Sequence, residues 1–144
     1  MKPLTYMNLS GAPVSEWARA HSIERTDVLV YLDDVALPLG RLRLRERGTD
    51  GGHNGLASVL QSLGGTDVAR VRIGIRPQGQ DDNDSRVEGL RDFVLAPFTS
   101  EERPLVDEVL SRVVAATRTI LSEGGGMTKA MSLYNAAPIA SQGS

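Results

Sequence analysis

Cysteine is absent from the sequence of 144 residues. Without thiols the chain can form no disulfide, has no cysteine nucleophile and offers no sulfur ligand to a metal ion. Histidine is also scarce, because His21 and His53 are the only two. A zinc site would then need carboxylate ligands in an arrangement that the sequence does not show. Any hydrolysis by this chain is therefore expected to proceed without a metal.

Long apolar runs are lacking as well. None approaches the roughly 18 residues that a membrane-spanning helix needs, and the N-terminus lacks the charged start and apolar centre of a signal peptide. We therefore expect a cytoplasmic protein with no membrane partner. The phosphate-binding loop of P-loop NTPases and the Gly-x-Ser-x-Gly elbow of serine hydrolases are also missing, which excludes both classes.

Segments with strand patterns alternate with segments that have helix patterns. Strands are predicted at 27–32, 41–47, 68–75 and 92–95, and helices at 10–21, 56–63, 99–121 and 127–135. The second helix is expected to end at Gly64, and Thr99 with Glu102 forms a capping box at the start of the third. A chain of this length suits one domain, and the alternation predicts the α/β class.

A basic middle stands within an acidic protein. Residues 41–76 hold seven arginines against three acidic residues, although the whole chain has a net charge of −2. In the strand predicted over 41–47, arginines alternate with leucines, so the guanidinium groups would line one face and the leucines would face the core. Four cations on one face repel each other without a counter-charge. We therefore favour a polyanion such as RNA as the partner over a merely solvated face.

A glycine-rich turn precedes the second predicted helix and contains the string Gly51-Gly52-His53-Asn54-Gly55. The N–H groups and the positive dipole end of the helix favour an anion or a developing oxyanion there, and they disfavour a protonated His53. A capped turn that binds no ligand explains the same string equally well.

Polar residues beside the first strand and the first helix are further candidates. Asp33 and Asp34 are expected to end the strand at 27–32, and either could orient a histidine or serve only as a strand end. Asn8 precedes a helix that Ser10 is expected to cap. Its amide can position a water or a carbonyl, or it can be a helix-entry residue only.

Taken together, these strings resemble the bacterial peptidyl-tRNA hydrolase family. The motifs occur in family order over nearly the whole chain, at Lys2 to Gly11, Asp33 to Gly40, Gly51 to Leu56, Arg70 to Ile75, Phe93 to Leu95, Ala130-Met131 and Asn135. The resemblance implies a single α/β domain over residues 1–135 with a twisted, mixed sheet flanked by helices, and a flexible tail at 136–144. It also implies a monomer without a cofactor.

The resemblance further implies a substrate and a set of site residues. Members of the family hydrolyse the ester between a peptide and tRNA, with a histidine as general base and an aspartate, matched here by Asp33, that orients it. Positions that contact the peptidyl-tRNA end are matched by Tyr6, Met7, Asn8, His53 and Asn54. Positions that hold tRNA phosphates are matched by Arg43, Arg45 and Arg72.

The sequence departs from the family at the general base. The family's first strand, its Gly-Asn-Pro-Gly type loop and its Thr-Arg-His-Asn type segment have no match here, and neither His21 nor His53 occupies the position of the base. General-base help is typically worth about 10²–10⁴ in rate. We therefore expect these 144 residues to hydrolyse peptidyl-tRNA slowly or not at all.

Two other functions stay open. The chain could be a non-catalytic module that binds tRNA or another RNA through the basic face. Alternatively, His53 could act as a substitute base in a different esterase reaction, assisted by Asp33 or Asp50.

Overall fold

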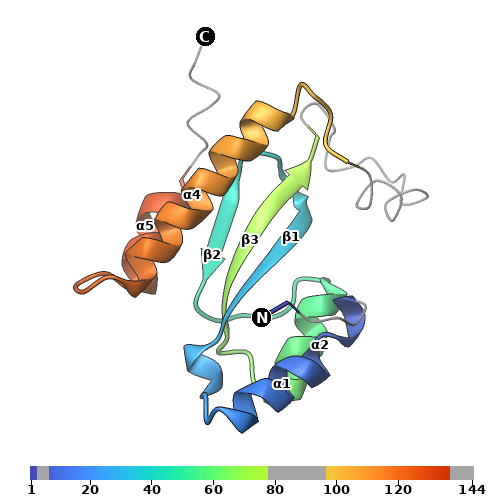
Figure 1. Ribbon diagram of the computed structural model, residues 1–144, viewed down its shortest axis with the longest axis vertical. Helices are drawn as coiled ribbons and strands as arrows, with labels where there is room; N and C mark the ends of the chain where they lie inside the picture. Colours follow the sequence, from blue (N-terminus) through green and yellow to red (C-terminus); the bar gives the residue numbers. More distant parts are fainter. Residues whose placement is uncertain (3–6, 78–96, 137–144) are drawn as a thin grey trace. The chain divides into compact units, whose positions relative to one another are not determined.

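The computed structural model describes residues 1–2, 7–77 and 97–136 (Figure 1). Its helices and strands are, in chain order, η1 (Met7–Leu9), α1 (Gly11–Ala20), η2 (Arg25–Asp27), β1 (Leu29–Pro38), β2 (Leu42–Arg45), α2 (Asn54–Leu63), β3 (Ala69–Arg76), α4 (Arg103–Leu121) and α5 (Met127–Tyr134). This succession confirms the predicted α/β class. The strand predicted at 92–95 and the tail from residue 137 lie outside the described residues.

The three strands form one sheet in the order β1-β3-β2, so β3 is the central strand. β1 and β3 run in the same direction, because the Leu39 N–H, just after β1, donates to the Arg76 carbonyl at the end of β3. β2 runs in the opposite direction to β3, because the Gly74 N–H donates to the Arg41 carbonyl at the beginning of β2. The sheet is therefore mixed, as the family resemblance implied.

The first strand is longer than the sequence predicted. β1 continues to Pro38, so Asp33 and Asp34 lie inside the strand and do not end it. The Asp34 side chain is buried, and its Oδ1 accepts the backbone N–H of Ala36 at 2.9 Å. Its Oδ2 accepts a hydrogen bond from Arg72 at 3.1 Å. A carboxylate with partners on both oxygens does not need to reach water, which explains why the strand tolerates it.

The chain divides into two compact units, each of which is described by itself. Unit 1 comprises Met1–Leu32 with Arg45–Val71, and unit 2 comprises Asp33–Leu44 with Arg72–Ser144. In unit 1, α1 and η1 both pack against α2 (Figure 1). The buried core of this unit is formed by Leu32, Leu56, Leu60 and Val68, with Val28, Val30 and Leu63 packed against it.

In unit 2, α4 packs against α5 (Figure 1). Arg112 on α4 donates to the carbonyl oxygens of Gly40 at 3.1 Å and Tyr134 at 3.5 Å. Asn135, which follows α5, binds both backbone groups of Leu44 through its side-chain amide, accepting from the N–H at 2.6 Å and donating to the carbonyl at 3.0 Å. These bonds connect the two helices to the segment that contains β2.

The ends of the helices agree with the predictions in part. α2 ends at Leu63 and is followed by Gly64, which has a positive φ of 78°. Thr99 and Glu102 form the predicted capping box, with bonds of 3.0 and 3.2 Å, but α4 begins only at Arg103, so the box lies in the turn before this helix. Ser10, in contrast, does not cap α1, because its own backbone is helical. The first N–H of α1, that of Gly11, donates to Ser58 Oγ on α2 at 2.9 Å. A partner from another helix has replaced the local cap.

Within residues 1–2, 7–77 and 97–136, no helix combines the length and apolar character that crossing a bilayer would require. In the same ranges, no three potential metal-binding side chains gather into one group.

Candidate functional site

Unit 1 brings two of the predicted substrate-binding amides onto elements that touch. Asn8 lies in η1, Asn54 is the first residue of α2, and η1 packs against α2. Both residues are exposed, so a ligand can reach them from solvent. Of the two other candidates nearby, Tyr6 lies outside the described residues, and Met7 is described only by its backbone in η1.

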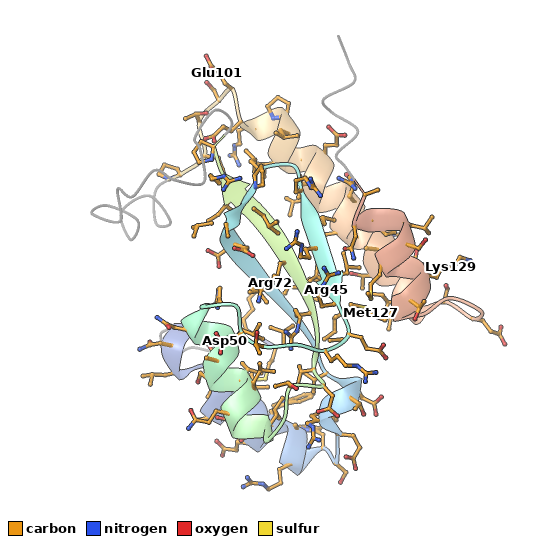
Figure 2. The ribbon with its side chains drawn as sticks, turned by 180° about the vertical axis from the view of Figure 1, so that it is seen from behind. Arg45, Asp50, Arg72, Glu101, Met127 and Lys129 are labelled. Atoms are coloured by element: carbon orange, nitrogen blue, oxygen red, sulfur yellow. The ribbon has the colours of Figure 1, made fainter. Side chains whose placement is uncertain are left out.

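The loop before α2 is held in a tight turn. Asp50 Oδ1 accepts the N–H of Gly52 at 2.7 Å, and the Asp50 carbonyl accepts the N–H of His53 at 3.1 Å. Gly51 and Gly52 have positive φ angles of 60° and 86°, a backbone conformation that favours glycine. Asp50 therefore has a structural task in this turn, at the position labelled in Figure 2.

His53 caps α2 with its side chain. Its Nδ1 accepts the backbone N–H of Leu56 at 3.1 Å. A ring nitrogen that accepts a hydrogen bond uses its lone pair to do so. The lone pair that a general base needs is thus occupied by the helix cap, which argues against His53 as a substitute base.

Arg70 forms hydrogen bonds to the segments before and after α2, all within unit 1. Its side chain is almost fully buried, with 1% exposure. Nη1 donates to the carbonyl of Thr49 before α2, at 2.9 Å. Nη2 and Nε donate to the carbonyls of Thr66 and Val68 after α2, at 3.1 and 2.9 Å. Sequence reasoning counted Arg70 in the charge of residues 41–76, but its guanidinium is committed to the fold, where three carbonyl partners allow a cation to be buried.

β2 shows the predicted alternation. Leu42 and Leu44 are buried, whereas Arg43 and Arg45 are exposed. The arginines are therefore on the face that solvent reaches, as their spacing predicted, and Figure 2 labels Arg45 on this strand.

Arg72 on β3 differs from these two arginines. Its Nη1 donates to Asp34 Oδ2 at 3.1 Å, and the two side chains are only 13% and 11% exposed. Their charges are therefore largely balanced within unit 2. Asp33, the neighbour of Asp34 in β1, is half-buried in the same unit. That Asp33 orients the general base stays a prediction.

Comparison with known proteins decides the family. The sequence model described as peptidyl-tRNA hydrolase matches residues 1–142. The chain belongs to the peptidyl-tRNA hydrolase family. It is 43% identical over 137 residues to the peptidyl-tRNA hydrolase of Thermotoga sp. (strain RQ2), covering 94% of this chain and 68% of that protein. It is 45% identical over 137 residues to the peptidyl-tRNA hydrolase of Chloroflexus aggregans, with the same two shares.

Crystal structures of peptidyl-tRNA hydrolases have the same fold. The enzyme from Acinetobacter baumannii matches with a TM-score of 0.76 and 32% identity, over 94% of this chain and 65% of that one. A peptidyl-tRNA hydrolase in complex with N-propanol matches with a TM-score of 0.77 and 31% identity, over 95% and 65%. The chain thus spans about two thirds of the length of these relatives.

Sequence reasoning missed two groups of residues that support the segments carrying the candidate site. Arg70 supports the loop before Asn54, and the bond between Gly11 and Ser58 joins α1 to α2 near Asn8. The alternation of residues 69–76 gave no sign that one arginine would be buried. Gly11 and Ser58 are 47 residues apart, so no local pattern connects them.

Proposed function

We propose that this protein hydrolyses the ester bond between a peptide and tRNA, which recycles tRNA for translation. The observation that carries the proposal is the match of residues 1–142 to the peptidyl-tRNA hydrolase family. We further propose that it works in the cytoplasm, as a monomer, with peptidyl-tRNA as its partner.

In this proposal the two exposed amides of unit 1 bind the peptidyl end of the substrate. The side chains of Asn8 and Asn54 can each donate and accept a hydrogen bond, as an ester carbonyl and an attacking water require. As the family pattern implies, His53, Met7 and Tyr6 also contact this end of the substrate in the proposal. With Nδ1 bonded to the Leu56 N–H, His53 can contact the ribose or the peptide through the rest of its ring.

The exposed arginines bind the phosphates of the tRNA. Arg43 and Arg45 project from the solvent side of β2, where guanidinium groups can hold phosphate oxygens through two hydrogen bonds each. Arg72 completes the set in the family pattern. Because its guanidinium is paired with Asp34 and mostly buried, we propose that it contributes less than the other two.

Neither of the two histidines in these 144 residues is placed to act as the general base. His53 uses Nδ1 to cap α2, and the ring of His21 is stacked on Trp17 with 3.9 Å between centroids. In the proposal Asp33 orients a histidine supplied by the family's N-terminal segment. The 144 residues should therefore bind the substrate but turn it over slowly.

The test compares two proteins in the hydrolysis of N-acetylated aminoacyl-tRNA. One is the chain of 144 residues, and the other carries the histidine-containing N-terminal segment of a Thermotoga relative. We expect the extension to raise the rate by about 10²–10⁴. The same extension with its histidine changed to alanine is the control and should lose the gain. Equal rates in all three proteins would refute the proposed base, and no hydrolysis by any would refute the proposed function.

A non-catalytic RNA-binding module is the second candidate, and the exposed arginines of β2 favour it. It predicts salt-sensitive binding of tRNA with no preference for the peptidyl end. The enzyme predicts tighter binding of an N-acylated aminoacyl end than of a free one.

A further inference from the structure

We infer that the contact between Gly11 and Ser58 determines how the two substrate-binding asparagines are spaced, and so sets the selectivity of this protein for the acylated end of tRNA. The inference rests on the proposed function, because it assigns a purpose to the positions of Asn8 and Asn54. Gly11 and Ser58 are positioning residues in this view and do not touch the substrate.

The contact is a very close approach of two helices. The Gly11 N–H donates to Ser58 Oγ at 2.9 Å. A Cβ atom built on Gly11 would lie 2.0 Å from the Ser58 carbonyl oxygen and 2.4 Å from Ser62 Oγ. Only a residue without a side chain can occupy this position, since real Cβ atoms essentially never come closer than 3.0 Å. The bond and the missing Cβ together hold the backbone of α1 directly against α2.

The contact is close in the chain to both asparagines. Gly11 follows Asn8 by three residues, and Ser58 follows Asn54 by four, which is about one helical turn. η1, which contains Asn8, also packs against α2, which begins with Asn54. A displacement of α1 from α2 at the contact must therefore move the two asparagines relative to each other.

Two substitutions separate the two components of the contact. Gly11→Ala introduces a Cβ whose nearest obstacle is a backbone oxygen, which no change of side-chain rotamer can move away. The helices must then separate by about 1 Å, and a misplacement of that size can cost on the order of 100-fold in a precisely aligned site. Ser58→Ala removes the hydrogen bond and adds no volume, so its effect should be smaller.

The experiment measures binding, so that it does not depend on turnover. The probes are an N-acetylated aminoacyl-adenosine with an amide in place of the ester, and uncharged tRNA. We expect Gly11→Ala to weaken binding of the adenosine probe by about tenfold or more. Ser58→Ala should weaken it by about threefold. Neither variant should change binding of uncharged tRNA, because the arginines of β2 are untouched.

Ser62→Ala is the matched control. Ser62 is one turn further along α2 and also lies close to Gly11. The Ser62→Ala variant should bind both probes as tightly as the parent protein does. Thermal unfolding of each variant shows that it is folded. If Gly11→Ala does not fold, Ser58→Ala decides the question alone.

The outcomes separate the inference from the function on which it rests. Folded variants that bind the adenosine probe as tightly as the parent would overturn the inference. An equal loss for both probes would overturn it too, because it would indicate general damage. A parent protein that binds the acylated probe no better than adenosine itself would instead overturn the proposed function.

Discussion

Two neighbouring strands of this sheet have arginines at alternate positions and use them in opposite ways. On β2, which lies at one edge of the three strands that the structure describes, Arg43 and Arg45 are exposed. On the central strand β3, Arg70 is buried among backbone carbonyls and Arg72 is paired with Asp34. A side chain on a central strand has neighbours on both sides of its face, whereas one on an edge strand has them on one side only. The place of a strand in the sheet therefore decides whether its cations can bind a ligand.

The comparison also shows why a charge count along the chain overstates a binding surface. Of the seven arginines between residues 41 and 76, Arg70 and Arg72 are committed to the fold. A buried guanidinium is tolerated only where its donors have partners, and in this protein carbonyls and a carboxylate supply them.

The largest change in the free energy of unfolding is expected for Arg70, the most buried of these arginines. Arg70→Met should lower the free energy of unfolding by about 3 kcal/mol or more, because it removes three hydrogen bonds made by a charged, almost fully buried side chain, each worth about 1.5–3 kcal/mol. Arg43→Met, the same change at an exposed position, should stay within about 0.5 kcal/mol. Urea denaturation of both variants tests this, and equal losses would show that burial does not distinguish the two strands.

A smaller effect is expected at the paired arginine. Asp34→Asn keeps the shape of the side chain and its bond to Ala36, but removes the negative charge that pairs with Arg72. The free energy of unfolding should fall by about 2 kcal/mol, the range of a hydrogen bond to a charged group. The double variant Asp34→Asn with Arg72→Met should recover part of the loss. A double variant less stable than the single one would contradict this account of the pair.

The exposed arginines should be distinguished by salt. For uncharged tRNA, the slope of log Kd against log salt should be smaller in Arg43→Ala than in the parent protein by about 0.7–0.9, which is the contribution of one phosphate contact. Arg72→Ala should change the slope less, since this cation is already paired. Equal changes in slope would mean that Arg72 leaves Asp34 when RNA binds.

The smallest effect concerns an arginine pair near the surface of unit 1. Arg25 Nε donates to Asp67 Oδ1 at 2.5 Å, with both side chains about 40% exposed. This hydrogen bond lowers the pKa of Asp67 from its usual 3.8 and raises that of Arg25. A lowered carboxyl pKa stabilises the fold above the unfolded value, and the gain is lost as pH falls through the folded value.

We expect the difference in unfolding temperature between the parent protein and Asp67→Asn to depend on pH. The parent should unfold at a higher temperature near pH 6, and the difference should shrink as pH falls below about 4. Glu46→Gln is a control, since Glu46 lies 3.8 Å from Arg47 in a more exposed pair. A difference that stays constant down to pH 2 would mean that the charge of Asp67 does not stabilise the fold.

Local patterns in the sequence predicted part of the fold correctly. The alternation in β2, the end of α2 at Gly64 and the capping box of Thr99 and Glu102 all form as expected. Each depends on residues within a few positions of one another, so the sequence contains all the information needed.

The predictions for the end of β1 and the cap of α1 were wrong for one shared reason. β1 was expected to end at Leu32, before Asp33 and Asp34, but Arg72, 38 residues from Asp34 in the chain, pairs with the Asp34 carboxylate inside the strand. Ser10 was expected to cap α1, but Ser58 supplies the partner from another helix. In both cases a distant group satisfied a polar atom for which sequence reasoning allowed only local partners or water.

The sequence by itself determined the α/β class, the family and the candidate residues for binding a substrate. Only the tertiary structure decided that Arg70 and Arg72 bond within the fold, that His53 caps a helix, and that a glycine lets α1 touch α2. The physical reason is that burial and hydrogen-bond partners come from segments far apart in the chain. Periodicity records which face of an element is apolar, but it does not record what covers that face.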